Sequence, residues 1–304
     1  MIFASPSDFR KHLTHRANQI SRTTGRAVGD LLQQYYLARL TARVFHDDPH
    51  GWLIKGGQAM LVRYPDARHS RDVDLVYSSD DGLNMNEAIV ALRRAAAVDL
   101  NDYLRFDFLD CKQPAPGASG RKVRFNTYVG TTQVIVLGVD LVVDHQPIGQ
   151  PVTHQLEPVI DIEGVAFWPV VRLYPIVDHL ADKICAIIER HGKDNSPSGR
   201  YRDLVDLILI IQAESIDGQE LHVILRTEVA RRQARGTVIT LPVRFRAPDP
   251  VDWENGYRKQ AKGVPNLDEF RTLGPAVAFG AKFIDPLLRT EPPGTWNPDA
   301  VRWD

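Results

Sequence analysis

Two aspartates in the first third of the chain form the pattern most suggestive of chemistry. Asp72 and Asp74 alternate with a valine and a leucine in the run DVDLVY. Residues i and i+2 of a strand point to the same face, so a strand here would place two carboxylates side by side above a buried apolar face. Adjacent carboxylates repel unless a cation lies between them, and a hard divalent ion with oxygen ligands is the usual one. The pattern predicts a metal site, although a lone Asp-x-Asp is more often a solvated strand end.

A glycine pair precedes these aspartates. Lys55 ends an apolar run, and Gly56 and Gly57 follow it where a short helix over 57–64 is predicted. Glycines allow close backbone approach to a ligand, and the amides at a helix N-terminus form a natural anion site. A phosphate site close in sequence to a metal site indicates one metal-bound nucleotide.

The loop between the glycines and the aspartates is basic and contains Arg68, Ser70 and Arg71. Both guanidiniums could contact phosphate, and the hydroxyl of Ser70 could donate to it. An ordinary exposed loop is the alternative for the arginines, since exposed charges are usually just solvated.

The rest of the N-terminal half predicts the elements that would position these residues. Apolar residues at helical spacing predict helices, and Asn84 or Asn86 could cap the last of them. Runs of β-branched and aromatic residues, separated by loop residues at 113–120 and by Gly130, predict an antiparallel meander. The helices are expected over 6–20, 27–45 and 84–98, and the strands over 72–77, 103–109, 122–129 and 133–143.

The last meander strand, VIVLGVDLVV, is apolar enough to be central but contains Asp140. A charge in a central strand is unfavourable unless it is paired or bound to metal. Beside the Asp72 strand, Asp140 would be a third metal-binding carboxylate. The alternatives are that Asp140 pairs with an arginine such as Arg124, or that Asp144 is the third carboxylate.

The C-terminal half returns to helical periodicity. Residues 146–172 are rich in proline and are expected to be an irregular bridge, with short strands around 158–168. Helices are then predicted from Pro175, from Arg200, over 217–235 and over 266–289, and the aromatic residues of the tail are expected to pack back onto the body.

Three charged residues of these helices are candidates for function. Lys183 borders an apolar stripe, where a lysine is most often a surface residue with a buried stem. Asp203 and Asp206 open the helix after Arg200, where the helix dipole alone favours acids. Asp203 is preferred because it directly follows a basic pair.

Composition limits the classes of protein. The 304 residues are 43% hydrophobic and 25% charged with a net charge of −1, so any nucleic-acid surface must be local. Residues 1–45 and 226–262 are the segments enriched in Arg and Lys. Cys111 and Cys185 lack metal-type spacing, no apolar run approaches the ~18 residues of a membrane span, and the N-terminus lacks a signal-peptide core. A reduced, cytoplasmic protein is expected.

The motifs together resemble a known family. Residues 55–57 read Lys-Gly-Gly and residues 68–75 read Arg-x-Ser-x-Asp-Val-Asp-Leu. This pattern is similar to the first motif of the AbiEii/AbiGii-type nucleotidyltransferase toxins, a group that includes the MenT toxins of MenAT toxin-antitoxin systems. They belong to the DNA polymerase beta-like superfamily, in which Gly-Ser is frequent, whereas Lys-Gly-Gly is usual in the AbiEii branch. The run Asp178–Lys183 and the Arg-Asp-x-x-Asp-Leu pattern at 202–207 are also similar to family motifs.

The resemblance implies an α+β fold, with a nucleotidyltransferase-type mixed or antiparallel sheet flanked by helices and a mostly helical C-terminal domain. The expected boundaries are 1–170 for the core and 171–304 for the helical domain. The implied activity is a toxin that uses Mg²⁺, or Mn²⁺, to transfer NMP from an NTP to the 3′ end of tRNA and so blocks translation. A cognate antitoxin is the expected partner. The implied catalytic residues are Asp72, Asp74, Asp140, Lys183 and Asp203, the first three as metal ligands, and the implied nucleotide-binding residues are Lys55, Gly56, Gly57, Arg68, Ser70 and Lys183.

Two other functions remain compatible with the sequence. One is a nucleotidyltransferase that modifies a protein or a small molecule. The other is a toxin module that binds NTP and metal without turnover. The intact set of three aspartates and Lys183 argues against the second, because a degenerate site could lose any of them.

Overall fold

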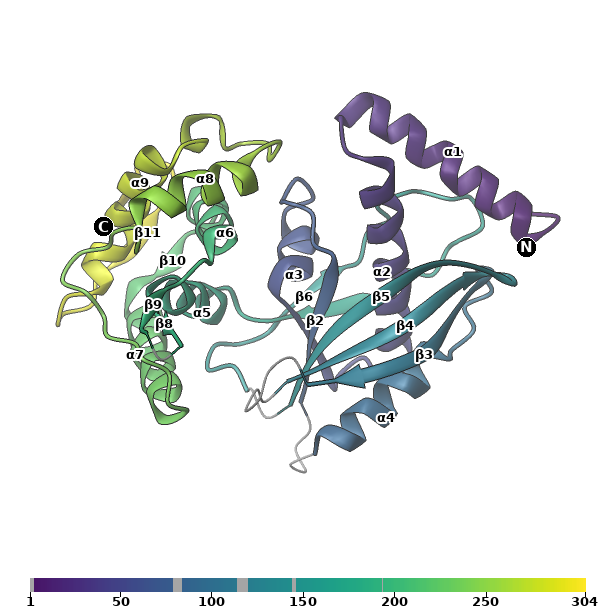
Figure 1. The fold of residues 1–304 in the computed structure, drawn as a ribbon, viewed down its shortest axis with the longest axis horizontal. Coiled ribbons are helices and arrows are strands. Elements are labelled where there is room, and N and C mark those ends of the chain that lie inside the picture. The colour runs from purple at the N-terminus through teal and green to yellow at the C-terminus, as the bar shows by residue number, and fades with distance from the viewer. Residues whose placement is uncertain (1–2, 79–83, 114–119, 144–145, 193) are drawn as a thin grey trace. The chain divides into compact units, whose positions relative to one another are not determined.

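A computed structural model describes residues 3–78, 84–113, 120–143, 146–192 and 194–304. The chain is α+β, as expected, with a seven-stranded mixed sheet and a helical C-terminal half (Figure 1). It divides into two compact units that interleave in sequence. Unit 1 comprises Met1–Pro65, His69–Gln146 and Pro151–Tyr174, and unit 2 comprises Asp66–Arg68, Pro147–Gln150 and Pro175–Asp304.

Unit 1 is built on the seven-stranded sheet, in the order β3-β4-β5-β2-β1-β7-β6. The predicted meander is present, since β3, β4 and β5 pair antiparallel, and β2 pairs parallel to β5. This parallel pairing brings the aspartate strand beside Asp140. The strands are β1 Trp52–Lys55, β2 Asp72–Tyr77, β3 Leu104–Lys112, β4 Arg121–Val129, β5 Thr132–Val143, β6 Val152–Gln155 and β7 Val170–Leu173.

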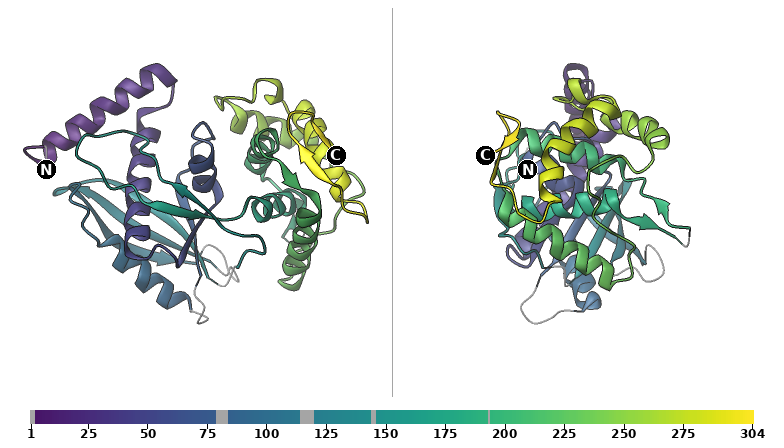
Figure 2. Two further views of the ribbon diagram at one scale, coloured as in Figure 1. Left: turned by 180° about the vertical axis from the view of Figure 1, so that it is seen from behind. Right: turned by 90° about the vertical axis from the view of Figure 1, so that its left-hand side faces the viewer.

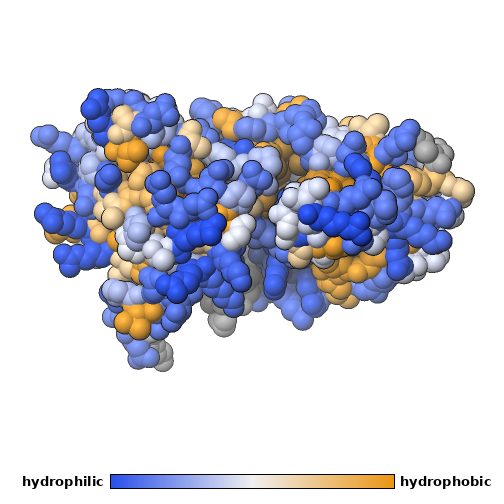
Figure 3. All heavy atoms as spheres, turned by 90° about the horizontal axis from the view of Figure 1, so that it is seen from above, coloured by the Kyte–Doolittle hydropathy of each residue, from blue (hydrophilic) through white to orange (hydrophobic). Residues whose placement is uncertain are grey.

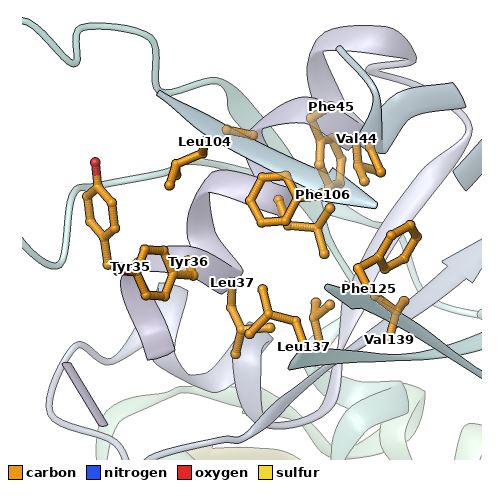
Figure 4. Close-up of a cluster of buried hydrophobic side chains, with 14 of the residues drawn as sticks. Tyr35, Tyr36, Leu37, Val44, Phe45, Leu104, Phe106, Phe125, Leu137 and Val139 are labelled. Atoms are coloured by element: carbon orange, nitrogen blue, oxygen red, sulfur yellow. The ribbon is translucent and has the colours of Figure 1, made fainter. Parts of the chain in front are cut away.

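The helices of unit 1 are α1 Pro6–Thr24, α2 Val28–Asp47, α3 Gly56–Arg63 and α4 Met85–Ala96. Helices α2 and α4 pack on each other and on β5, and the views from front and back place both along the sheet (Figures 1 and 2). Their apolar side chains meet those of β3, β4 and β5 in the main core, where Phe45 and Phe106 lie among leucines and valines (Figure 4). The opposite side chains of β4, which include Lys122 and Arg124, stay partly exposed.

Local sequence signals account for the helix ends. Ser5 caps α1 by accepting the amide N–H of Asp8, and Gly25 ends the helix at φ +73°. Asn84, one of the two expected caps, forms a capping box with Glu87 at the start of α4.

Helix α2 contains two buried arginines that its apolar pattern does not reveal. Arg39 donates from Nε to Asp102 at 2.7 Å, and Arg43 holds both oxygens of the same carboxylate at 2.5 and 3.1 Å. All three residues are at most 1% exposed. Arg39 and Arg43 therefore join α2 to the turn before β3 and add nothing to the basic surface expected for residues 1–45.

Unit 2 is mainly helical. Its helices are α5 Ile176–Ile188, α6 Tyr201–Ala213, α7 Gly218–Ala234, α8 Pro250–Ala261 and α9 Leu273–Leu287, with a short 3-10 turn at Asp268–Phe270. Short strands form a hairpin and a small sheet: β8 Arg190–His191 with β9 Ser196–Pro197, and β10 Ile216–Asp217, β11 Thr295–Asn297 and β12 Arg302–Trp303. The prediction that the aromatic tail packs back on the body is confirmed, because Trp253, Tyr257 and Trp296 are at most 1% exposed.

Two expectations for the linking segments are wrong. No strand lies within 158–168, where buried Ile160 and Ile162 anchor a turn closed by the amide of Val165 on the carbonyl of Ile162. The pairing strands β6 and β7 flank this segment instead. The helix expected over 266–289 begins only at Leu273, and helix α8 was not expected, because the prolines on either side of 250–261 masked its periodicity.

The molecular surface is mainly hydrophilic on the face seen in Figure 3, with apolar side chains scattered among charged ones. None of the helices in the described segments combines the length and the apolar composition that a membrane span requires.

Candidate active site

The three predicted carboxylates lie on two adjacent strands of unit 1. In the parallel pairing of β2 with β5, Asp74 stands opposite Asp140 and Asp72 stands opposite Gly138. Opposite residues share a face of the sheet, and so do Asp72 and Asp74 two residues apart. The sheet therefore brings all three carboxylates to one face, with the side chains of Asp72 and Asp140 35% and 39% exposed.

A fourth charged residue joins them that the sequence reading missed. Lys122, opposite Asp140 on β4, places Nζ 2.7 Å from Asp72 and 3.4 Å from Asp140. Partial burial disfavours the charged lysine, but the two carboxylates outweigh it and raise the pKa of Lys122. A predicted register for the 122–129 and 133–143 hairpin would have placed Lys122 across from Asp140.

Gly138 makes the lysine bridge sterically possible. A Cβ at Gly138 would overlap Oδ1 of Asp72 and lie 3.0 Å from Cε of Lys122.

Arg124, the alternative partner of Asp140, instead donates from Nε to Asp110 at 2.7 Å. Asp144, the alternative third carboxylate, lies outside the described residues.

The glycine pair opens α3 beside the aspartate strand. Lys55 is paired in register with Asp74, and Gly56 follows at φ +63°. A Cβ at Gly56 would overlap Oδ2 of Asp74, so only glycine allows this approach. The first turn of α3, which includes Gly57, contains no acidic residue, and the Lys55 side chain does not cap it. The N-terminus of α3 and the Asp74 carboxylate are therefore neighbours.

The basic loop is divided between the two units. Ser70 belongs to unit 1 and donates its hydroxyl to the carbonyl of Asp72 at 3.1 Å. Arg68 belongs to unit 2, where Nε and an Nη donate to the two oxygens of Asp206, both at 2.8 Å. The guanidinium thus makes a bidentate contact with a carboxylate.

Lys183 lies at the centre of a buried ionic cluster in unit 2. Its Nζ is 3.1 Å from Asp203 and 2.6 Å from Asp206, and the lysine is 3% exposed. Arg200 donates to the other oxygen of Asp203 at 2.5 Å. Burial opposes the charge on Lys183, but the aspartates prevail and raise its pKa. With Arg68 on Asp206 and Arg200 on Asp203, these side chains form one connected set of ion pairs around Lys183.

The carboxylate site suits a divalent cation by its chemistry. It offers oxygen ligands only, and a cationic group, the ammonium of Lys122, already lies between two of them. Within the described part of the chain, no three His, Cys, Asp or Glu side chains are yet gathered closely enough to hold a metal. The residues therefore fit a divalent ion in type and charge, with the ammonium of Lys122 now lying between Asp72 and Asp140.

The chain matches a family of nucleotidyltransferases. The family model described as "Nucleotidyl transferase AbiEii toxin, Type IV TA system" matches residues 38–276, and the chain belongs to this family of toxin-antitoxin nucleotidyltransferases. The matched range contains every predicted site residue, from Lys55 to Asp203.

Solved structures that align with the chain include MenT4, a nucleotidyltransferase toxin from Mycobacterium tuberculosis H37Rv. It aligns at 16% identity and a TM-score of 0.49, covering 94% of this chain and 99% of that one. JHP933 from Helicobacter pylori aligns at 16% identity and a TM-score of 0.44, over 85% of this chain and 91% of that one. None of the curated proteins is similar enough in sequence to match the chain.

Proposed function

We propose that this nucleotidyltransferase transfers NMP from an NTP to the 3′ end of tRNA and thereby blocks translation. The observation that carries the transfer chemistry is the meeting of Asp72, Asp74 and Asp140 on one sheet face beside the glycine-opened helix α3. The tRNA acceptor rests on the resemblance of the sequence to the MenT-like branch, and the cytoplasm is where such an acceptor is found.

Asp72, Asp74 and Asp140 would hold Mg²⁺, or Mn²⁺, as oxygen ligands. When bound, the metal lowers the pKa of the acceptor hydroxyl and neutralises the charge that develops on the phosphates. Asp140 would help to deprotonate the attacking hydroxyl, since it stands opposite Asp74 and is partly open to solvent.

The triphosphate would lie at the start of α3. The amides of Gly56 and Gly57 point from a helix N-terminus, where an anion is favoured. Lys55 adds an ammonium at this end of β1, stacked 5.0 Å from the ring centroid of Tyr174. The hydroxyl of Ser70 would exchange its bond to the Asp72 carbonyl for a phosphate oxygen.

The family resemblance assigns Lys183 and Arg68 to nucleotide binding, where they would supply positive charge. Lys183 carries three N–H donors, and its bonds to Asp203 and Asp206 use two of them. Asp203 would orient the ammonium, and Asp206 would hold the guanidinium of Arg68.

The family also implies an antitoxin as the partner of this toxin. The expected biological consequence is that expression of the chain arrests growth and that the antitoxin relieves the arrest. An Asp72→Asn variant should be harmless when expressed alone.

One assay distinguishes transfer to tRNA from transfer to a protein or small molecule and from nucleotide binding without transfer. Purified protein is incubated with Mg²⁺ and each α-labelled NTP in turn, with total tRNA or with cell protein from which RNA has been removed. Label on tRNA with one NTP is the expected result. Label on protein or on a small molecule would contradict the tRNA proposal, and nucleotide binding without any transfer would point to a binding module.

A further inference from the structure

The charged face of the sheet contains a lysine that no step of the proposed chemistry has used. Lys122 bridges Asp72 and Asp140 through Nζ at 2.7 and 3.4 Å. We propose that Lys122 is an internal counter-ion that occupies the metal position in the nucleotide-free protein, so that the site accepts a metal–triphosphate complex and discriminates against free metal. This inference rests on the proposed carboxylate metal site.

The arrangement of β4 and β5 is built around this bridge. Lys122 lies directly across from Asp140 in the antiparallel register, so its stem already points over the carboxylate face. To reach Asp72, one strand further, the stem crosses β5 at Gly138. Any larger residue at Gly138 would collide with Asp72 and crowd the lysine, so the glycine provides the path for the ion pair.

Arg124, two residues further along β4 on the same face, forms a different ion pair. It pairs with Asp110 on the outer strand β3, away from Asp72. On this face of β4, Arg124 thus turns toward β3, and Lys122 turns toward the carboxylates of β2 and β5. The ammonium of Lys122 carries one positive charge between the carboxylates of Asp72 and Asp140, and a divalent ion at the same position would carry two.

Competition follows from this geometry. A free divalent ion must displace the tethered ammonium, and the released ammonium then gains no new partner in the site. When the ion arrives with a triphosphate, the displaced Lys122 can turn to a phosphate oxygen, so its charge remains paired. Lys122 therefore lowers the affinity for free metal and couples metal binding to nucleotide binding, as a reciprocal linkage requires.

The test is Mn²⁺ binding to full-length protein without nucleotide, measured by electron paramagnetic resonance. Lys122→Gln should bind Mn²⁺ at least about tenfold more tightly than the unmodified protein, and Lys122→Arg, which keeps the charge, should not. Lys112→Gln is the matched control, because Lys112 stands opposite Lys122 on the same face but one strand further from the carboxylates. Asp72→Asn in the Lys122→Gln background should abolish the gained affinity.

Adding a non-hydrolysable NTP analogue supplies a second readout. The analogue should tighten Mn²⁺ binding strongly in the unmodified protein and less in Lys122→Gln. Equal Mn²⁺ affinity in the two proteins, with binding still dependent on Asp72, would overturn the counter-ion role and leave the proposed metal site intact. Absence of Asp72-dependent Mn²⁺ binding in every variant, even with the analogue, would overturn the proposed site itself.

Discussion

Gly56 combines an unusual backbone conformation with a close approach to a predicted metal ligand, Asp74. It adopts φ +63°, a region that residues with a Cβ rarely enter, and its Cα faces the carboxylate of Asp74. The first motif requires glycine here for two independent reasons, one conformational and one steric.

Gly56→Ala should therefore lower both stability and activity. The strain at this φ should reduce the free energy of unfolding by about 1–3 kcal/mol. Displacement of Asp74 should reduce kcat/KM for nucleotide transfer by about a hundredfold. Chemical denaturation and a transfer assay measure the two effects.

The control is Gly29→Ala in α2, where an added Cβ meets no atom within 4 Å. This variant should keep full activity and unfold within about 1 kcal/mol of the original protein. Equal behaviour of the two variants would show that Gly56 has no special role.

At the scale of elements, helix α2 depends on a buried carboxylate for its position. Asp102 is the partner of both Arg39 and Arg43. Burial alone would raise the pKa of Asp102, but the hydrogen bonds and charges of Arg43 and Arg39 outweigh it and lower that pKa below its usual range. A lowered pKa in the folded state means that folding favours the ionised form.

Asp102→Asn should lower the free energy of unfolding by about 3–5 kcal/mol at pH 7, because it leaves two buried guanidiniums without a carboxylate. In the original protein this stabilisation is present above the unfolded pKa of about 3.9 and is lost as the pH falls through the lower folded pKa. Denaturation between pH 7 and pH 3 should therefore show the two proteins converging in stability at the acid end. A constant difference over this range would contradict the ionised pairing.

The elements that carry the site follow from the sequence because their periodicity is strong and their ends are marked. The strand over 72–77 and the helix cap at Asn84 are found as predicted. The sequence also predicts that Asp140 lies beside the strand of Asp72 and Asp74, whereas the parallel direction of this pairing comes from the structure.

The ion pairs between residues distant in sequence could not be predicted from the sequence. Lys122, Arg39 and Arg43 look like surface cations in a linear reading, yet each binds a carboxylate 50 or more residues away. Such partners depend on strand register and helix packing, which composition does not encode. The same holds for Arg68 and Asp206, whose separation of 138 residues is closed only by the fold of unit 2.

At the scale of the whole molecule, the net charge of −1 leaves RNA binding to local surfaces. With Arg39 and Arg43 buried, the exposed cations of the N-terminal segment are mainly those of α1, namely Arg10, Lys11 and Arg22. In the 226–262 segment, Arg232 is likewise bound to Asp182, Glu189 and Glu228.

Reversing the charges of Arg10, Lys11 and Arg22 to Glu should raise KM for tRNA about tenfold or more at low salt, while KM for NTP stays unchanged. The difference from the original protein should shrink as salt rises. Steady-state transfer assays over a range of KCl concentrations measure this. An unchanged KM for tRNA would exclude the outer face of α1 as an acceptor-binding surface.

Nucleotide transfer by this protein should depend on the carboxylates of β2 and β5. The most direct test of this dependence compares Asp140→Asn with Asp110→Asn, since both aspartates lie on the same sheet face but Asp110 pairs with Arg124. At saturating NTP and tRNA, we predict that Asp140→Asn lowers kcat by at least about a hundredfold and that Asp110→Asn changes it by less than about threefold. Equal kcat values for Asp140→Asn and the original protein, with both folded, would contradict the account.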